Sequence, residues 1–267
     1  MAREVIFQLN NVSYRYPGGE DALSDVSLTV FRGEKVVLLG ANGCGKSTLL
    51  KILDGLQFPQ EGTVYAFGKL LSEENLGCEE FAFAFRRRVG FVFQNSDAQL
   101  FNSSVWEEIA FGPVQMGLEP EEVNRRVEEV IALLGLGHIK DRPPYKLSGG
   151  EKKKVAIASV LSINPEVLLL DEPTGGLDPR TTRWLINLIR QLNQAGKTLV
   201  TSTHDLDIVS EIADKVLVFS EDHRLVAAGP PEEILNNRAL LLQVNLVDDQ
   251  FHYHLHSNGH RHYHAHG

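Results

Sequence analysis

The chain has 267 residues, enough to bury a full core in one large domain or in one domain with an inserted lobe. Its 26 basic and 35 acidic residues give a net charge of −9, which argues against a broad nucleic-acid-binding surface. The two cysteines, Cys44 and Cys78, are too few for a disulfide framework, so we expect a reducing compartment.

Membrane segments are not expected. The longest apolar runs fall far short of the ~20 residues that a membrane helix needs, and the N-terminus lacks an apolar run of signal-peptide length. We therefore expect a soluble protein that reaches a membrane only through a partner.

Short apolar runs rich in β-branched residues predict buried strands. They are bounded by Gly, Asp or Pro and lie at residues 35–40, 89–94, 167–172, 198–203 and 215–220. Runs without polar alternation are typical of strands buried on both faces, as in a mainly parallel sheet. Because helix-period segments alternate with them, the order of elements indicates an α/β core.

Two amphipathic helices are predicted between these strands. The first begins near Pro120, ends at Gly135 or Gly137, and has one apolar face made of Val123, Val127, Val130, Ile131 and Leu134. The second covers residues 180–194, with an inward face made of Trp184, Leu188, Ile189 and Leu192. The alternating Phe81, Phe83 and Phe85 are compatible with a strand or with the flank of a helix.

Residues 40–47, GANGCGKS, fit the phosphate-binding pattern G-x-x-x-x-G-K-[ST] and stand between a predicted strand and a predicted helix. In this pattern glycines let backbone N–H groups surround phosphates, Lys46 reaches the terminal phosphates, and Ser47 offers its hydroxyl to Mg²⁺. The predicted cofactor-binding residues of this segment are Gly40, Asn42, Gly43, Gly45, Lys46, Ser47 and Thr48. The position of Cys44 beside Lys46 and a helix N-terminus predicts a reactive thiolate.

A second motif, VLLLDEPTGGLDP, begins at residue 167. Asp171 ends the predicted strand and is placed to hold Mg²⁺, and the carboxylate of Glu172 can polarise a water for in-line attack on a γ-phosphate. A helix cap or an exposed acid at a strand end would explain either residue alone. The phosphate-binding pattern upstream favours the catalytic interpretation.

Residues 147–161, LSGGEKKKVAIASVL, closely resemble the signature of ATP-binding-cassette (ABC) ATPases. By this resemblance, Tyr16 is the aromatic residue that stacks on adenine, and Gln94 joins the Mg²⁺ site to a helical lobe. Asp178 belongs to the loop that crosses the dimer interface, and His204 is the switch histidine that contacts the γ-phosphate.

Ser148, Gly149 and Gly150 precede a predicted helix and so form a second anion-binding N-terminus. One phosphate loop already holds the chain's own nucleotide. The resemblance implies that the second cradle caps the nucleotide of a neighbouring copy in a head-to-tail homodimer.

The resemblance covers residues 4–235 and implies an α/β fold, a P-loop NTPase core with a mainly parallel sheet. To this core the family adds an N-terminal antiparallel β portion and a helical lobe inserted at about 96–163, all within a domain over 1–246. The implied cofactors are ATP and Mg²⁺, and the implied activity is ATP hydrolysis coupled to transmembrane transport. The implied partners are an integral membrane coupling subunit and a substrate-binding membrane subunit, at the cytoplasmic face of a prokaryotic membrane. No nucleic-acid partner is expected.

The wording of the motifs VGFVFQNSDAQLF and LSGGEKKKVAIA is similar to that of energy-coupling-factor importers, and closest to their cobalt and nickel subgroup. Ser96 departs from that group, which usually has proline there.

A vitamin importer of the same type remains an alternative. A soluble ABC ATPase acting on nucleic acid is another, but it would need coiled coils, zinc-hook cysteines or a second cassette. A catalytically dead cassette is opposed by intact Lys46, Asp171, Glu172 and His204.

The C-terminal residues 247–267 are rich in histidine and are expected to be disordered. Alternation places imidazoles on one side of an extended chain, where they can bind a borderline metal such as Ni²⁺, Co²⁺ or Zn²⁺. A purification tag or a functionless tail are the other interpretations. The candidate metal ligands are His252, His254, His256, His260, His262, His264 and His266.

Overall fold

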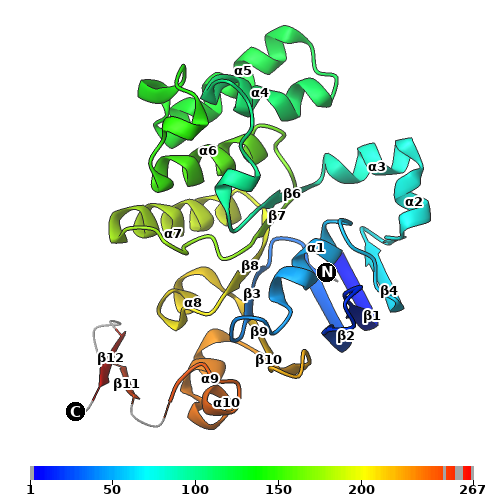
Figure 1. The fold of residues 1–267 in the computed structure, drawn as a ribbon, viewed down its shortest axis with the longest axis vertical. Coiled ribbons are helices and arrows are strands. Elements are labelled where there is room, and N and C mark those ends of the chain that lie inside the picture. The colour runs from blue at the N-terminus through cyan, green and yellow to red at the C-terminus, as the bar shows by residue number, and fades with distance from the viewer. Residues whose placement is uncertain (1–2, 249–250, 256–260, 266–267) are drawn as a thin grey trace. The chain divides into compact units, whose positions relative to one another are not determined.

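The computed structural model describes residues 3–248, 251–255 and 261–265 of the chain, which Figure 1 draws as a ribbon. Contacts divide it into two compact units. One unit combines Met1–Leu70 with Thr201–Gly267, and the other is Leu71–Val200. We refer to them as the first and the second unit.

The first unit begins with an antiparallel sheet. Its strands β1 (Val5–Arg15), β2 (Asp21–Phe31), β4 (Glu61–Ala66) and β5 (Lys69–Leu70) lie in the order β2-β1-β4-β5. Along β1 the apolar side chains of Ile6, Phe7, Leu9 and Val12 are buried. This sheet is the N-terminal antiparallel portion that the sequence resemblance implied.

A second group of strands in the first unit follows the parallel pattern. β3 (Lys35–Leu39) pairs in parallel with β9 (Lys215–Phe219), and β10 (Leu225–Gly229) pairs antiparallel with β9. Every residue of β3 after Lys35 is buried, as expected for a strand covered on both faces. The helices of this unit are α1 (Lys46–Leu53), α8 (Leu206–Ile212), α9 (Pro231–Asn236) and α10 (Arg238–Gln243).

The second unit contains the parallel pair β6 (Val89–Val92) and β7 (Val167–Leu170), both fully buried. Strand β8 (Thr198–Thr203) lies where the two units divide. The predicted strands are thus confirmed, with ends shifted by up to two residues. The helix α7 (Pro179–Gln194) precedes β8, and α2 (Glu73–Gly77) and α3 (Glu79–Arg86) precede β6.

Three helices pack together in the second unit: α4 (Val105–Gln115), α5 (Pro120–Leu134) and α6 (Gly149–Leu161). They are drawn in green in Figure 1. Helix α5 begins at Pro120 and is closed by Gly135, whose φ of 69° is the left-handed conformation typical of a helix end. All five apolar residues of its predicted face are buried, which confirms that prediction.

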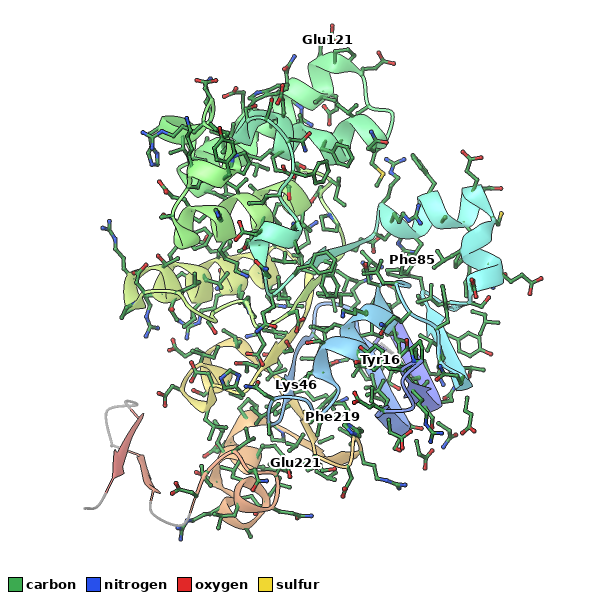
Figure 2. All side chains as sticks on the ribbon, viewed as in Figure 1. Tyr16, Lys46, Phe85, Glu121, Phe219 and Glu221 are labelled. Atoms are coloured by element: carbon green, nitrogen blue, oxygen red, sulfur yellow. The ribbon has the colours of Figure 1, made fainter. Side chains whose placement is uncertain are left out.

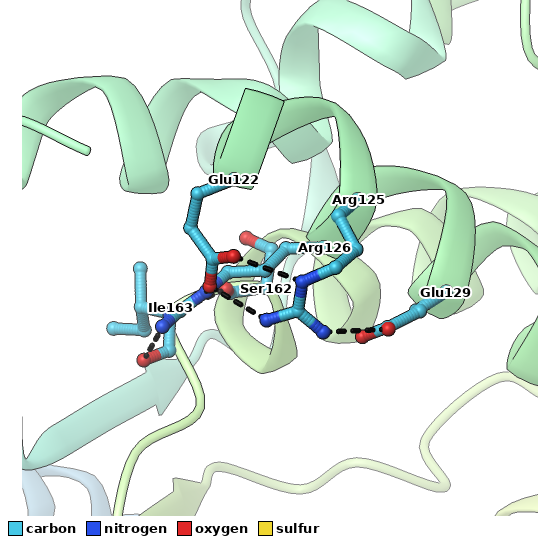
Figure 3. Close-up of polar contacts among 6 residues, drawn as sticks. All are labelled: Glu122, Arg125, Arg126, Glu129, Ser162 and Ile163. Carbon is cyan, nitrogen blue, oxygen red and sulfur yellow. Dashed lines mark hydrogen bonds and ion pairs between the residues drawn. The ribbon is translucent and has the colours of Figure 1, made fainter. Parts of the chain in front are cut away.

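A charged cluster fastens α5 to the end of α6 (Figure 3). Arg126 donates from Nε to Glu122 Oε1 at 2.6 Å, and its Nη1 lies 3.5 Å from the carbonyl oxygens of Ser162 and Ile163. Arg125 binds the same Glu122 and also Glu129. These arginines hold the pKa of Glu122 well below its usual range, at about 2.

The structure decides one open question about the helices and corrects one expectation. Phe81 and Phe85 lie one turn apart on α3 with their rings stacked, so the alternating phenylalanines belong to a helix. Figure 2 labels Phe85, the buried member of the set. On α7 the buried residues are Leu185, Ile186, Leu188 and Ile189, so Trp184 and Leu192 do not belong to its buried face.

The C-terminal segment contains two further strands, β11 (Phe251–Leu255) and β12 (Arg261–Ala265), which pair antiparallel. Among the described residues, no helix combines the length and the apolar character that crossing a bilayer requires.

Candidate functional site

The phosphate loop belongs to the first unit, where residues 40–45 connect β3 to α1. Gly45 occupies the N-cap of α1 with a φ of 104°. A Cβ added to Gly45 would lie 2.1 Å from the carbonyl oxygen of Ala22, so this position excludes every side chain. Asn42 and Gly43 are exposed, and Ser47 lies half-buried in the first turn of α1.

Lys46 begins α1 and is only 5% exposed. Its Nζ donates to the carbonyl oxygens of Gly40 at 2.7 Å and Ala41 at 2.9 Å. The ammonium group is thus held inside the loop that would bind the phosphates, where it could contact a terminal phosphate. Figure 2 labels Lys46 and Phe219. A Cβ added to Gly40 would lie 2.8 Å from the carbonyl oxygen of Phe219.

Tyr16 approaches the same helix from the turn between β1 and β2. Its hydroxyl forms a 2.9 Å hydrogen bond with Thr48 Oγ1, and Tyr14 packs edge-on against its ring. Tyr16 and Thr48, both predicted to bind the cofactor, are therefore neighbours in the structure. The bond orients the aromatic ring beside the phosphate loop.

Cys44 is also enclosed by the loop. The side chain is 1% exposed, and its Sγ lies 4.0 Å from Lys46 Nζ. The sequence analysis expected Lys46 beside Cys44, and the structure confirms it. The burial of Cys44 argues against its predicted reactivity, because an alkylating reagent could reach the sulfur only if the loop opened. The expectation of a readily reactive thiol is therefore corrected.

His204 follows β8 in the first unit and is exposed. The next residue, Asp205, caps α8 by accepting from the backbone N–H of Asp207 at 3.0 Å. His204 lines a cleft together with Asp205, Asp207 and residues 245–248. The structure thus places His204 next to the segment that leads into the histidine-rich tail.

Asp171 and Glu172 lie in the second unit, directly after β7, and each is 5% exposed. The backbone N–H of Asp171 donates to Val92 at 3.0 Å, which ties the end of β7 to the end of β6. Glu172 has a φ of 40°, a left-handed conformation that non-glycine residues adopt only at a cost. Such strain is concentrated at functional positions, in agreement with the catalytic interpretation.

Gln94 stands just beyond β6, and its backbone is held by a residue that sequence reasoning missed. Lys153 of α6 is 3% exposed and donates from Nζ to the carbonyl oxygens of Phe93 at 3.1 Å and Gln94 at 2.8 Å. Burial lowers the pKa of Lys153 to about 8, and the charge of Asp171 partly opposes this shift. The only available signal was the run of three lysines, which normally indicates a solvated face.

Ser148, Gly149 and Gly150 form the N-terminus of α6, as predicted. Ser148 accepts from the backbone N–H of Glu151 at 3.4 Å, and Glu151 Oε2 accepts from the backbone N–H of Ser148 at 2.8 Å. The bonds from Ser148 lower the pKa of Glu151. This capping box fixes where the helix begins. Gly149 has open space around its Cα, whereas Gly150 abuts Thr181.

Asp178 has a structural role within the chain. It caps α7 by accepting from the backbone N–H groups of Arg180 at 2.9 Å and Thr181 at 3.0 Å, and from the hydroxyl of Thr181 at 2.6 Å. These bonds, led by that of the Thr181 hydroxyl, lower the pKa of Asp178. A sequence reading of Asp-Pro before a helix could have found this cap.

The donor types of the predicted Mg²⁺ ligands suit that ion. Ser47, Gln94 and Asp171 offer hydroxyl, amide and carboxylate oxygens, the hard ligands that Mg²⁺ prefers. Within the described part of the chain, no three His, Cys, Asp or Glu side chains gather into a ready-made metal cluster. For the tail, His256, His260 and His266 lie outside the described residues.

The predicted site residues fall on both units. The first unit holds Tyr16, the phosphate loop and His204. The second unit holds Gln94, residues 148–150, Asp171, Glu172 and Asp178.

Comparisons with known proteins agree with these motifs. A family model described as "ABC transporter" matches residues 23–175. The nickel import ATP-binding protein NikO of Rhodobacter capsulatus is 51% identical over 244 residues, covering 90% of this chain and 95% of that protein.

Two solved structures are similar over most of their length. CbiO1 of Clostridium perfringens, part of the ABC transporter complex CbiONQ, has a TM-score of 0.78 at 36% identity, covering 91% of this chain and 95% of the other. A dimeric ATP-binding cassette in a post-hydrolysis state with ADP and phosphate has a TM-score of 0.77 at 30% identity, covering 85% and 99%.

Proposed function

Because this chain belongs to the ABC transporter family of ATPases, we propose that it drives a membrane importer for a transition-metal ion, cobalt or nickel. As a member of the family, the chain binds and hydrolyses ATP with Mg²⁺. The cargo rests on similarity: the nickel import protein NikO is 51% identical over nearly the whole chain. The motif wording, which is closest to the cobalt and nickel subgroup of energy-coupling-factor importers, supports the same assignment.

Each residue of the site then has a role. The backbone of residues 40–45 and the ammonium of Lys46 bind the phosphates, and Tyr16 stacks on the adenine. Ser47, Gln94 and Asp171 would hold Mg²⁺, and the ion would neutralise charge on the phosphates. Glu172 accepts a proton from the attacking water, and His204 contacts the γ-phosphate. The observation that carries this assignment is the phosphate loop, with Lys46 buried among its carbonyls.

The chain works as a homodimer in this proposal. The N-terminus of α6, with its open Gly149, caps the nucleotide of the other copy, and the loop of Asp178 lies at the interface. The dimeric cassette with ADP and phosphate, 30% identical, supports this arrangement. A membrane-embedded coupling subunit and a substrate-binding subunit complete the importer, with the ATPase at the cytoplasmic face of a prokaryotic membrane.

Uptake measurements test the cargo. The chain, co-expressed with the membrane proteins that co-purify with it, should support accumulation of radioactive Ni²⁺ or Co²⁺, and Lys46→Ala should abolish it. Accumulation of a vitamin instead would favour the alternative importer. Co-purification with nucleic acid and no membrane protein would favour the soluble alternative, which the net charge of −9 disfavours.

The C-terminal hairpin supports a second role, transition-metal binding. The register of β11 and β12 pairs His252 with His264 and His254 with His262, with Tyr253 opposite Tyr263 between them. Imidazole is a suitable ligand for Ni²⁺, Co²⁺ and Zn²⁺. We assign these histidines a sensor or buffer role at the side of the membrane where an importer releases its cargo.

A further inference from the structure

The loop that contains Gln94 runs from the end of β6 to the short 3₁₀ turn Ser96–Ala98. Side chains of the loop and side chains of α6 both form polar contacts that hold the loop against the helix. Gln99 donates from Nε2 to the carbonyl oxygen of Ala156 at 2.8 Å, and its Oε1 accepts from the backbone N–H of Phe93 at 3.2 Å. From the helix, Lys152 forms an ion pair with Asp97 at 2.6 Å.

Lys153 makes the innermost of these bridges. Lysine is almost never fully buried unless its charge is compensated, because removing an ammonium group from water is costly. Here the compensation is two main-chain carbonyl oxygens, those of Phe93 and Gln94, at 3.1 and 2.8 Å. A buried cation that binds two consecutive carbonyl groups, one on each side of the Cα of Gln94, fixes the path of the chain there.

The neighbouring lysines show that this placement is specific. Lys152 is only partly buried and reaches Asp97, whose side chain is 65% exposed. Lys154 lies 4.8 Å from the ring of Trp184 on α7. Only the middle lysine of the run is enclosed beside the Gln94 peptide and Asp171.

We propose that Lys153 is a positioning residue for ATP hydrolysis, which holds the Phe93–Gln94 backbone so that the Gln94 side chain is presented to Mg²⁺. The bridge also joins Gln94 to the helix whose N-terminus carries Ser148. A displacement of α6 therefore moves the Gln94 backbone with it. This inference rests on the role of Gln94 in the proposed function.

The test compares Lys153→Met, which keeps the length of the side chain and removes its charge and donors, with Lys154→Met as the matched control. The first measurement is hydrogen exchange of the nucleotide-free full chain, read on peptides covering residues 89–101. Lys153→Met should speed exchange in residues 93–99 by about 10-fold, because the loop loses its innermost bridge. Lys154→Met should leave these peptides unchanged.

The second measurement is steady-state hydrolysis at varied ATP and Mg²⁺. Loss of a residue that orients a metal ligand typically costs about 10–100-fold in metal affinity or activity. Lys153→Met should therefore raise the half-saturating Mg²⁺ concentration and lower kcat by about 10-fold, with a KM for ATP within about twofold of the parent. Lys153→Gln keeps an N–H donor, so its kcat and half-saturating Mg²⁺ concentration should lie between those of the parent and those of Lys153→Met.

The outcomes separate this inference from the proposed function. A parent protein that does not hydrolyse MgATP would refute the assigned site roles. A hydrolysing parent with Lys153→Met equal to Lys154→Met in both measurements would refute only the positioning role. If Lys153→Met does not fold, as judged by a lost melting transition, Lys153→Gln decides: parent-like exchange, kcat and Mg²⁺ dependence would overturn the role, and intermediate values would support it.

Discussion

At the scale of single residues, the site combines burial with unusual backbone geometry. Lys46, Asp171 and Glu172 are each 5% exposed, so their charges act in surroundings from which water is largely removed. Electrostatic effects are stronger in such surroundings than in bulk water. ATP hydrolysis therefore depends on a few enclosed groups, and removing one of them should lower its rate strongly.

Glu172→Gln should lower the rate of ATP hydrolysis by about 10²–10⁴-fold, because the amide cannot accept the proton of the attacking water. Binding of ATP should persist, since the phosphate loop is untouched. Steady-state hydrolysis and a fluorescent-nucleotide titration measure the two effects. Glu128→Gln, an exposed change on α5, is the control. Parent-like turnover of Glu172→Gln would show that another group polarises the water.

At the scale of helices and strands, local contacts set how stability responds to pH. The pKa of Glu122 is lowered to about 2 by Arg125 and Arg126, against an ordinary value of 4.5. A carboxyl group with a lowered pKa in the folded state stabilises the fold above about pH 4.5 and loses this effect as pH falls toward about 2. The pair with Arg125 is exposed and the pair with Arg126 is only partly buried, so the effect should be small and salt-sensitive.

Glu122→Gln should therefore lower the urea midpoint at pH 7, and the difference from the parent should shrink between pH 4.5 and about 2. Equilibrium unfolding at several pH values measures this dependence. Glu121→Gln, an exposed change one residue earlier, controls for the loss of an acid at the helix N-terminus. A difference that stays constant down to pH 2 would contradict the role of the ion pairs.

The tail offers a prediction at the same scale. Deleting residues 249–267 should abolish Ni²⁺ and Co²⁺ binding but leave basal ATP hydrolysis intact, because every nucleotide motif ends before residue 248. Since only neutral imidazole is a ligand, affinity should fall steeply between about pH 7.5 and 5.5. Metal titrations of the full and shortened chains measure both effects. Equal binding by the two chains would exclude a metal site in the tail.

Sequence patterns predicted these elements unevenly, for physical reasons. The strands were predictable because a short apolar run has few alternative structures. Helix α5 was predictable because Pro120 marks its start and Gly135 its end. Phe81, Phe83 and Phe85 fit both a two-residue and a 3.6-residue period, so only packing decides for helix. Lys153 could not be placed because its partners are main-chain carbonyl oxygens, which leave no trace in the sequence. Cys44 was expected to be reactive from its charged neighbour, whereas its burial depends on tertiary packing.

For the whole molecule, the proposed dimer explains why the isolated chain should be a slow ATPase. Productive closure must bring the phosphate loop of one copy to the α6 N-terminus of another, and the charge of −9 on each copy opposes this weakly. A membrane partner that docks near residues 94–101 would align the two copies beforehand.

Adding the reconstituted membrane partner should therefore raise the rate of ATP hydrolysis, and the basal rate of the isolated chain should rise with salt that screens the repulsion. Hydrolysis assays with and without the partner, over a range of salt concentrations, measure both effects. Equal rates in the two preparations would contradict coupling between hydrolysis and the partner.

The left-handed backbone of Glu172 has a consequence for the evolution of the chain. A non-glycine residue in this conformation costs on the order of 1–3 kcal/mol, and glycine or asparagine would relieve part of that cost. A laboratory lineage selected only for heat resistance should therefore drift toward these residues at position 172 and lose its carboxylate. Stability and turnover therefore make opposite demands on the residue at this position.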